Sequence, residues 1–352
     1  MQEVHGAQLL KDLFGQLSER RVAYDKVRHG LELTRWILEQ HSPCPGSASA
    51  QSLSSNRTSN EQAMLSAYFD NCVYSETAAT ANSKIKADEL VGLKAALTSG
   101  KLVVRMSIAD IEEQLGDLDK SPKMAVERLR AARNLVGFQG MLKQPRDLLA
   151  DAVRAYVDGT QPPAVTLSEP ERRGLVFNYL SPLLAGKAST IRFALEVLSD
   201  VRAQKTQFFE SMAEARPLTL DLLNWKALNA KDRKGKDFDF FWKGAAHHWA
   251  GWVADGAGGD LGQAARERGL EGLLAVPAVR LSVMTALGQI YSQEVLGRAA
   301  RPSDGYDLWH ATLGSAADVF VTSDGDFADH LQRIPLDGFR VVRSIGELLL
   351  LV

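Results

Sequence analysis

The chain has 352 residues, of which 45% are hydrophobic and 24% are charged, and its formal net charge is −2. These values are typical of a folded globular protein and exclude a mostly disordered or collagen-like chain. The length is sufficient for one large domain or two ordinary ones. A net charge this close to zero provides no global positive field for nucleic acid, so binding of that kind needs a local patch.

Cysteine usage and hydropathy indicate where the protein resides. The chain has two cysteines, Cys44 and Cys72, which excludes a disulfide scaffold and a four-thiolate zinc site. Its first residues lack the basic and then apolar pattern of a signal peptide, and the longest apolar stretch, 270–300, is interrupted by charged residues. We therefore expect a cytoplasmic protein with reduced thiols and no membrane partner.

The first 63 residues divide into an N-terminal helical segment, 1–41, and a flexible linker, 42–63. Leucine and tryptophan side chains recur at helical spacing in the first segment. The second is rich in Ser, Asn and Pro and has no apolar period. Met64 follows directly, and the sequence leaves open whether residues 1–63 precede the native start.

Residues 64–117 alternate between strand and helix patterns. The first apolar run stops at Asp70, and Ser107 is a good N-cap for the last helix of this segment. Strand, helix, strand and helix within a short stretch are typical of a parallel α/β sheet. The predicted elements are strands at 66–69 and 102–106 and helices at 85–98 and 108–115.

Residues 118–300 have a different pattern. Ala, Leu, Arg and Glu recur at helical spacing and β-branched clusters are rare, which predicts about seven helices. One of them is expected to be long, covering 189–215. We find no period that would indicate a structural repeat. Breaks between helices are expected at 159–163, Gly186, Pro217, Gly235 and 256–259.

The α/β pattern returns in residues 301–352. Neither this segment nor 64–117 is large enough to bury a sheet alone, but together they have the size of a small domain. We therefore predict an α/β fold, with a small parallel-sheet domain in two parts, a large all-α insertion and additional N-terminal helices. The last predicted elements are helices at 304–317, at 327–334 and from Ser344, and strands at 318–322 and 339–342.

Carboxylates follow the predicted strands. Asp70 ends the first strand, and Asp324 and Asp326 follow the strand at 318–322. The carboxyl ends of parallel strands meet at one edge of a sheet, where ligands bind. Crowded carboxylates repel one another unless a hard cation such as Mg²⁺ or Mn²⁺ relieves the repulsion. Each acid alone also fits a turn or helix cap, so the indication is their joint placement. Further candidate acids are Glu112, Glu113 and Asp307.

Four segments around these acids have a more specific pattern. The most specific is 317–327 (ADVFVTSDGDF), in which Thr322 lies two residues before an acid. Together the four segments resemble the PIN domain nuclease family. The resemblance covers 64–117 and 301–352, under a third of the chain. The other three segments are 68–74 (YFDNCVY), 103–107 leading to Glu112 and Glu113, and 307–311 (DLWHA).

The resemblance implies a hydrolase that depends on Mg²⁺ or Mn²⁺ and cuts phosphodiester bonds as an endonuclease, with RNA the preferred substrate. The helix acid stays open, because spacing to Gly116 favours Glu112 whereas spacing from Ser107 fits Glu113. The implied metal-binding and catalytic acids are Asp70, Glu112 or Glu113, Asp307 and Asp324, with Asp326 as an accessory metal ligand and Asn71 and Thr322 as polar supports.

The resemblance also bears on partners. Many family members are toxins of bacterial toxin–antitoxin pairs, so it predicts a ribonuclease with an RNA substrate and a cognate antitoxin or inhibitor protein, and it leaves a homo-oligomer open. One alternative is a catalytically silent PIN-like module that binds RNA or a protein, and another is a helical interaction protein in which 118–300 is the functional part.

Two further features have competing interpretations. In 225–243, basic residues interleaved with aromatic ones suit single-stranded nucleic acid, but a solvated loop followed by a helix with core aromatics fits better. His310 could face the acids, but we expect it to pack beside Trp309. The candidate RNA-binding residues are Lys231, Arg233, Lys234 and Lys236.

Overall fold

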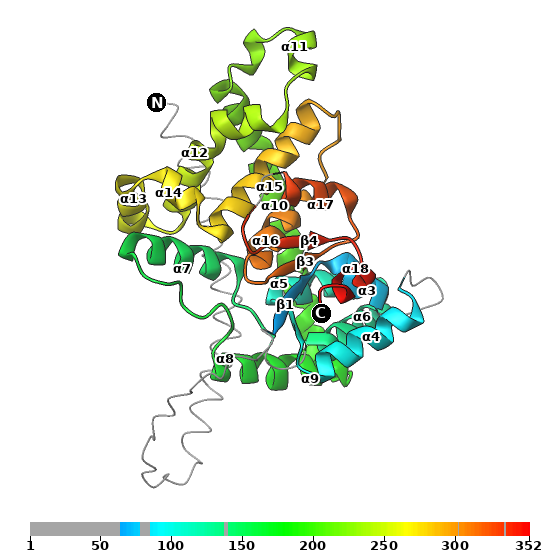
Figure 1. The fold of residues 1–352 in the computed structure, drawn as a ribbon. Helices are drawn as coiled ribbons and strands as arrows, with labels where there is room; N and C mark the ends of the chain where they lie inside the picture. Colours follow the sequence, from blue (N-terminus) through cyan, green and yellow to red (C-terminus); the bar gives the residue numbers. More distant parts are fainter. Residues whose placement is uncertain (1–63, 78–84, 137–139, 302, 334–335) are drawn as a thin grey trace, which may run out of the picture.

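A computed structural model shows the fold of the protein (Figure 1). The N-terminal helical segment and the linker predicted for 1–41 and 42–63 lie outside the residues that it describes. The described residues are 64–77, 85–136, 140–301, 303–333 and 336–352.

A four-stranded parallel sheet, in the order β2-β1-β3-β4, lies at the centre of the α/β part. Its two middle strands come from segments more than two hundred residues apart, with Phe69 opposite Val321. The predicted α/β class with a parallel sheet is confirmed. The strands are β1 (Leu65–Phe69), β2 (Leu102–Arg105), β3 (Val319–Val321) and β4 (Arg340–Val342).

Neighbouring side chains of β1 and β3 point into two different cores. Phe69 and Val321 belong to one hydrophobic cluster, whereas Tyr68 and Phe320 belong to another. This alternation is expected for strands buried on both faces. Helices therefore cover both faces: α4 (Ala87–Thr98), α6 (Pro122–Val136) and α18 (Ile345–Leu349) on the first, and α16 (Asp304–Gly314) and α17 (Gly325–Gln332) on the second.

Two short helices begin at the carboxyl ends of the first two strands. They are α3 (Asn71–Thr77) after β1 and α5 (Ile108–Gln114) after β2. Ser107 caps α5, as the sequence predicts, by accepting a backbone N–H of the first turn at 3.1 Å. Asp110 completes a capping box by accepting the Ser107 N–H at 2.6 Å. The start of α5 is therefore firmly fixed at this edge of the sheet.

The insertion is helical, as predicted, and has a hydrophobic core of its own. Its helices are more numerous than expected because several have only four or five residues, too few to show a period in the sequence. After η2 (Leu115–Asp117) and α6, they are α7 (Pro145–Asp158), α8 (Glu169–Arg173), η3 (Gly174–Leu180), α9 (Ser181–Leu184), α10 (Ala188–Leu222), η4 (Trp225–Ala227), α11 (Ala230–Lys234), α12 (Phe238–Gly256), α13 (Gly259–Arg268), α14 (Leu270–Leu274) and α15 (Pro277–Glu294).

The predicted break at Pro217 is wrong, because α10 continues through it to Leu222. A proline removes one helical hydrogen bond and usually kinks or ends a helix. Here Thr219 donates to the carbonyl of Ala215 at 2.9 Å and accepts the indole N–H of Trp249 at 3.1 Å. This buried contact holds the last turns of α10 against α12, so tertiary packing overrides the local signal.

The start of the insertion also touches the sheet. Leu142 donates its N–H to the carbonyl of Met106 at 2.7 Å, and Met106 donates to Gly140 at 3.0 Å. A side chain at position 140 would meet the carbonyl oxygen of Val104 at 2.1 Å, so the close approach requires a glycine. The bridge between Met106 and Met141 is a single residue pair, which is too short to produce a strand pattern in the sequence.

His330, on α17, is buried against α15, with its Nε2 2.9 Å from the hydroxyl oxygen of Ser292. Burial and the positive charges of Arg333 and Arg298 lower the pKa of His330 to about 4. A histidine in the unfolded chain titrates near pH 6.5, so the unfolded state binds more protons between pH 6.5 and 4. Its contribution to stability is therefore complete above about pH 6.5 and is lost as the pH falls towards 4.

We predict that His330→Gln loses less stability than the parent protein between pH 7.5 and pH 4.5. The expected difference is about 2 to 3 kcal/mol, because each pKa unit corresponds to about 1.4 kcal/mol. Urea unfolding at the two pH values measures it, with the exposed His247→Gln as a matched control. Equal acid sensitivity of His330→Gln and the parent would contradict this account.

Candidate functional site

Asp70 lies directly after β1 and is held by several groups. Its Oδ1 accepts the backbone N–H of Asn71 at 2.7 Å. Its Oδ2 accepts the hydroxyl of Thr322 at 2.7 Å and the thiol of Cys72 at 3.2 Å. The Asp70 N–H donates to the carbonyl of Val321 at 2.9 Å. This one residue therefore joins the carboxyl ends of β1 and β3, and its carboxylate is fixed in place.

Thr322 connects Asp70 with Asp324. Its hydroxyl oxygen accepts the backbone N–H of Asp324 at 3.1 Å while its proton is donated to Asp70. Asp324 caps α17, since its Oδ1 accepts the N–H of Phe327 at 3.0 Å, and it is exposed. Asp324 thus has an ordinary capping role. Its backbone N–H is also linked to the Asp70 carboxylate through the hydroxyl of Thr322.

His310, on α16, faces the acids, which corrects the expectation that it packs beside Trp309. Its Nδ1 lies 2.6 Å from the hydroxyl oxygen of Tyr68, and its Nε2 lies 2.8 Å from Oε2 of Glu113. The same Nε2 is 3.9 Å from Oδ1 of Asp70. The ring is only 2% exposed. One buried imidazole therefore joins β1, α5 and α16.

Counting hydrogen bonds shows where the protons of this network lie. The Tyr68 hydroxyl donates its one proton to Asp110 at 2.5 Å, so it must accept from Nδ1 of His310. Nε2 must donate to the carboxylate of Glu113, so both ring nitrogens are protonated and the ring is a cation. Burial opposes this charge, but the hydrogen bond and charge of Glu113, with the other carboxylates nearby, raise the pKa of His310 to about 10.

Asp110 and Tyr68 belong to the site but were missed in the sequence analysis. Asp110 is fully buried, and burial raises its pKa to about 6 against the opposing charge of His310. Burial and then the charge of Asp110 raise the pKa of Tyr68 well above its usual range. The spacing of Asp110 three residues after Ser107 marks a capping box, and this was the available signal.

Asp307 lies one turn before His310 on α16. Burial and the nearby carboxylates raise the pKa of Asp307 to about 8. Those carboxylates, in order of their effect, are Asp70, Asp304 and Asp324, and the charge of His310 acts in the opposite direction. Acids at the end of β1, at the start of α17 and on α16 therefore act on one another.

The two adjacent glutamates of α5 face different neighbours. Glu113 contacts His310, whereas the charge of Glu112 adds to burial in raising the pKa of Tyr179 in η3. Neighbouring positions on a helix point about 100° apart. The sequence left open whether Glu112 or Glu113 is the helix acid. In the structure, Glu113 contacts Nε2 of His310, the ring nitrogen that also faces Asp70.

Two other candidate residues are placed away from the carboxylate of Asp70. The Asp326 side chain is exposed and lies 3.6 Å from Nε of Arg298. The Asn71 side chain accepts a hydrogen bond from the amide of Gln114, so its backbone N–H and not its side chain supports Asp70. Asp326 is therefore paired with a cation near the end of the insertion.

The donor chemistry of these side chains suits a hard cation, because Mg²⁺ and Mn²⁺ prefer carboxylate oxygens. In the part of the chain that the structure describes, however, no group of three or more His, Cys, Asp or Glu side chains is arranged to hold a metal ion. In this arrangement the cationic ring of His310 offsets part of the negative charge of Glu113 and Asp70.

Three of the five aromatic residues of 225–243 lie in the core of the insertion, and Phe240 and Trp242 pack against it while partly buried. Trp225, Phe238 and Phe241 are all buried in one hydrophobic cluster. Their rings are therefore not available to stack on bases, and the interpretation as a helix with core aromatics accounts for them.

The basic residues of this stretch differ in their surroundings. Arg233 donates to a backbone carbonyl at 3.0 Å, and the ammonium of Lys236 lies 4.5 Å from the centre of the Phe240 ring. Lys231 and Lys234 are exposed on α11, which lies at the end of the molecule far from β1 and α5 (Figure 1). A role of these cations in binding RNA phosphates stays a prediction.

No protein-family model matches the chain, and comparisons with curated proteins and with solved structures find no match either. None of the helices in the described ranges is both long enough and apolar enough to cross a lipid bilayer. What the protein does must therefore be inferred from the site itself.

Asp307→Asn should stabilise the protein at high pH when divalent cations are absent. With a folded-state pKa of about 8, Asp307 is protonated in the folded protein but ionised in the unfolded chain between about pH 4 and 8. Its contribution to stability is therefore full below about pH 4 and is lost as the pH rises through 8. The asparagine side chain does not ionise, so Asp307→Asn does not lose this stability. The difference in Tm between the variant and the parent should therefore grow between pH 5 and pH 8.5.

Thermal melts in EDTA at the two pH values measure this gain, which we expect to increase by several degrees at about 2–4 °C per kcal/mol. Asp260→Asn, in the exposed first turn of α13, is the matched control and should respond equally at both pH values. A gain for Asp307→Asn that is independent of pH, or a loss at pH 8.5, would show that Asp307 is not crowded by other acids.

Proposed function

We propose that the protein is a metal-dependent endoribonuclease of the PIN-like type, which hydrolyses RNA phosphodiester bonds. The observation that supports this most strongly is the link from Asp70 through Thr322 to Asp324 at the carboxyl edge of a parallel sheet, together with the effect of both carboxylates on the pKa of Asp307. These acids come from the end of β1, the first turn of α16 and the N-cap of α17. Their order along the chain agrees with what the resemblance to PIN domains implies.

Mg²⁺ or Mn²⁺ is the cofactor of this proposal. The ion would supply an activated water and stabilise the charge that develops on the phosphate. The residues that would hold it are Asp70, Asp307 and Asp324, with Glu113 as the helix acid.

Other residues of the chain prepare these acids. The hydroxyl of Thr322 and the backbone N–H of Asn71 hold the Asp70 carboxylate in one orientation. Nε2 of His310 lies 2.8 Å from Oε2 of Glu113 and 3.9 Å from Oδ1 of Asp70, so both carboxylates face the same ring nitrogen. Preorganised carboxylates of this kind reduce the rearrangement needed when a substrate phosphate arrives.

A second candidate function is a catalytically silent PIN-like module that binds RNA or a protein. It is favoured by the cationic ring of His310, which lies among acids that a metal would otherwise neutralise, and by the lack of a ready coordination shell among the described residues. An antitoxin or inhibitor partner, a toxin role and a homo-oligomer rest on the resemblance alone.

We predict that the purified protein cuts single-stranded or structured RNA in Mg²⁺ or Mn²⁺, and that EDTA stops the cutting. Asp70→Asn should reduce the rate to the EDTA background, because it removes the charge of the acid that joins both central strands. A gel assay of a labelled RNA measures this, with Asp260→Asn as the control that keeps the parent rate.

Two results would change the proposal. A folded Asp70→Asn protein that cuts at the parent rate would show that the site is assigned wrongly. A parent protein that binds RNA but cuts it with neither ion would favour the silent module.

A further inference from the structure

The acids of the candidate site are poorly accessible to a substrate. The side chains of Asp70 and Glu113 are only 12% and 17% exposed, and the ring of His310 beside them is 2% exposed. A substrate phosphate has to contact groups at this edge of the sheet before any reaction can occur. An element that lies beside the acids therefore has to move for a substrate to enter, as lids do in many enzymes.

Helix α10 spans the distance between α5 and α16, the two helices that carry candidate acids. Arg202 of α10 donates to the carbonyl of Gly116 in η2, directly after α5, at 2.8 Å. Further along α10, Met212 lines a cavity together with Gly305 in the first turn of α16. α10 contacts both η2 and α16, and it runs past α16 in Figure 1. At 1.5 Å per residue, α10 covers about 15 Å from Arg202 to Met212. It therefore passes beside the edge of the sheet at which the acids lie.

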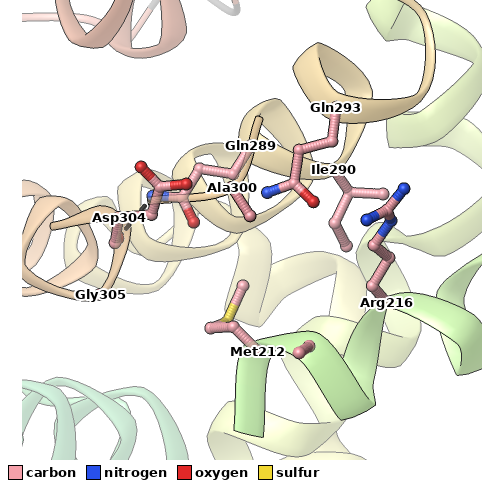
Figure 2. A pocket seen from close by; sticks show the side chains of 9 residues that line it. Met212, Arg216, Gln289, Ile290, Gln293, Ala300, Asp304 and Gly305 are labelled. Carbon is pink, nitrogen blue, oxygen red and sulfur yellow. Dashed lines mark hydrogen bonds between the residues drawn. The ribbon is translucent and has the colours of Figure 1, made fainter. Parts of the chain in front are cut away.

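Residues 199–214 of α10, which we call the strap, lie between two buried anchors. Of the side chains that the structure describes in this range, none is buried, whereas Leu198 and Ala215 on either side of it are. A cavity of about 70 Å³ lies beside the strap, and Figure 2 shows Met212 across it from Gln289 of α15. Segments with few buried contacts open locally at a low free-energy cost. The strap is therefore an element that can unwind while both anchors stay in place.

The strap is fastened near α5 by Arg202. The guanidinium donates to both carboxylate oxygens of Asp119, at 2.8 and 2.6 Å, in addition to the carbonyl of Gly116. The side chains of Arg202 and Asp119 are 43% and 39% exposed, so solvent and salt screen this ion pair. By contrast, Arg216, just beyond the strap, pairs with Glu294, whose side chain is 14% exposed. The contact of Arg202 is therefore the one that breaks more easily.

We propose that the strap is a lid over the acidic edge of the sheet, and that it opens by local unwinding when Arg202 leaves Asp119 and Gly116. Leu198 and Ala215 hold the two flanking parts of α10 during the opening. The unwound strap gives a substrate access to the acids between α5 and α16. The movement stands apart from the proposed nuclease function, whereas the role in substrate entry rests on it.

Hydrogen–deuterium exchange of the whole protein measures this opening. In Arg202→Met, the backbone amides of the strap should exchange about fivefold faster, a change that the loss of one such surface contact supports. Thr206→Ala should slow the same exchange about two- to threefold, because position 206 is exposed and alanine has the higher helix propensity. In an active protein, kcat/KM for RNA should rise and fall with the open fraction. Arg266→Met, which breaks an ion pair with Asp255 elsewhere in the insertion, is the matched control and should change neither measure.

The outcomes separate the two proposals. Strap amides that exchange no faster in Arg202→Met than in the parent would overturn the lid. An active parent whose kcat/KM is the same in both variants, although their strap exchange differs, would overturn the role in substrate entry. An inactive parent whose strap exchange shifts in both directions would overturn the proposed nuclease and leave the movement in place.

Discussion

Carboxylates gathered at the end of a small buried sheet repel one another, and this repulsion is costly unless positive charge lies among them. The cationic ring of His310 supplies that charge from within the fold, in contact with Glu113 and Tyr68. These three residues come from α16, α5 and β1, on both sides of a long insertion. The contacts that offset the acidic charge therefore also join the two halves of the α/β part.

The insertion is attached at the edge of the sheet where the acids lie. Near its start, Leu142 bonds to Met106 just beyond the end of β2, and at its end Arg298 bonds to the first residue of α16. Its middle forms a separate helical core, in which α10, α12 and α15 pack together.

Much of the fold and part of the site could be predicted because their signals are local. Strand ends such as Asp70 and caps such as Ser107 depend on residues close in the sequence, and the structure confirms both positions. The direction of His310 could not be predicted, because it depends on a tyrosine from a strand more than two hundred residues away. Asp110 has the spacing of an ordinary cap, and only the fold reveals its burial. Pro217 suggests a break that long-range packing suppresses.

The central claim is that Asp70, Asp307 and Asp324 share a divalent cation, and crystals of the parent protein soaked in MnCl₂ test it most directly. Anomalous difference density identifies Mn²⁺ without any need for activity. The account predicts a peak in contact with the Asp70 carboxylate and with at least one of Asp307 and Asp324. Crystals with no peak at this edge of the sheet, and with the contact between His310 and Glu113 unchanged, would contradict it.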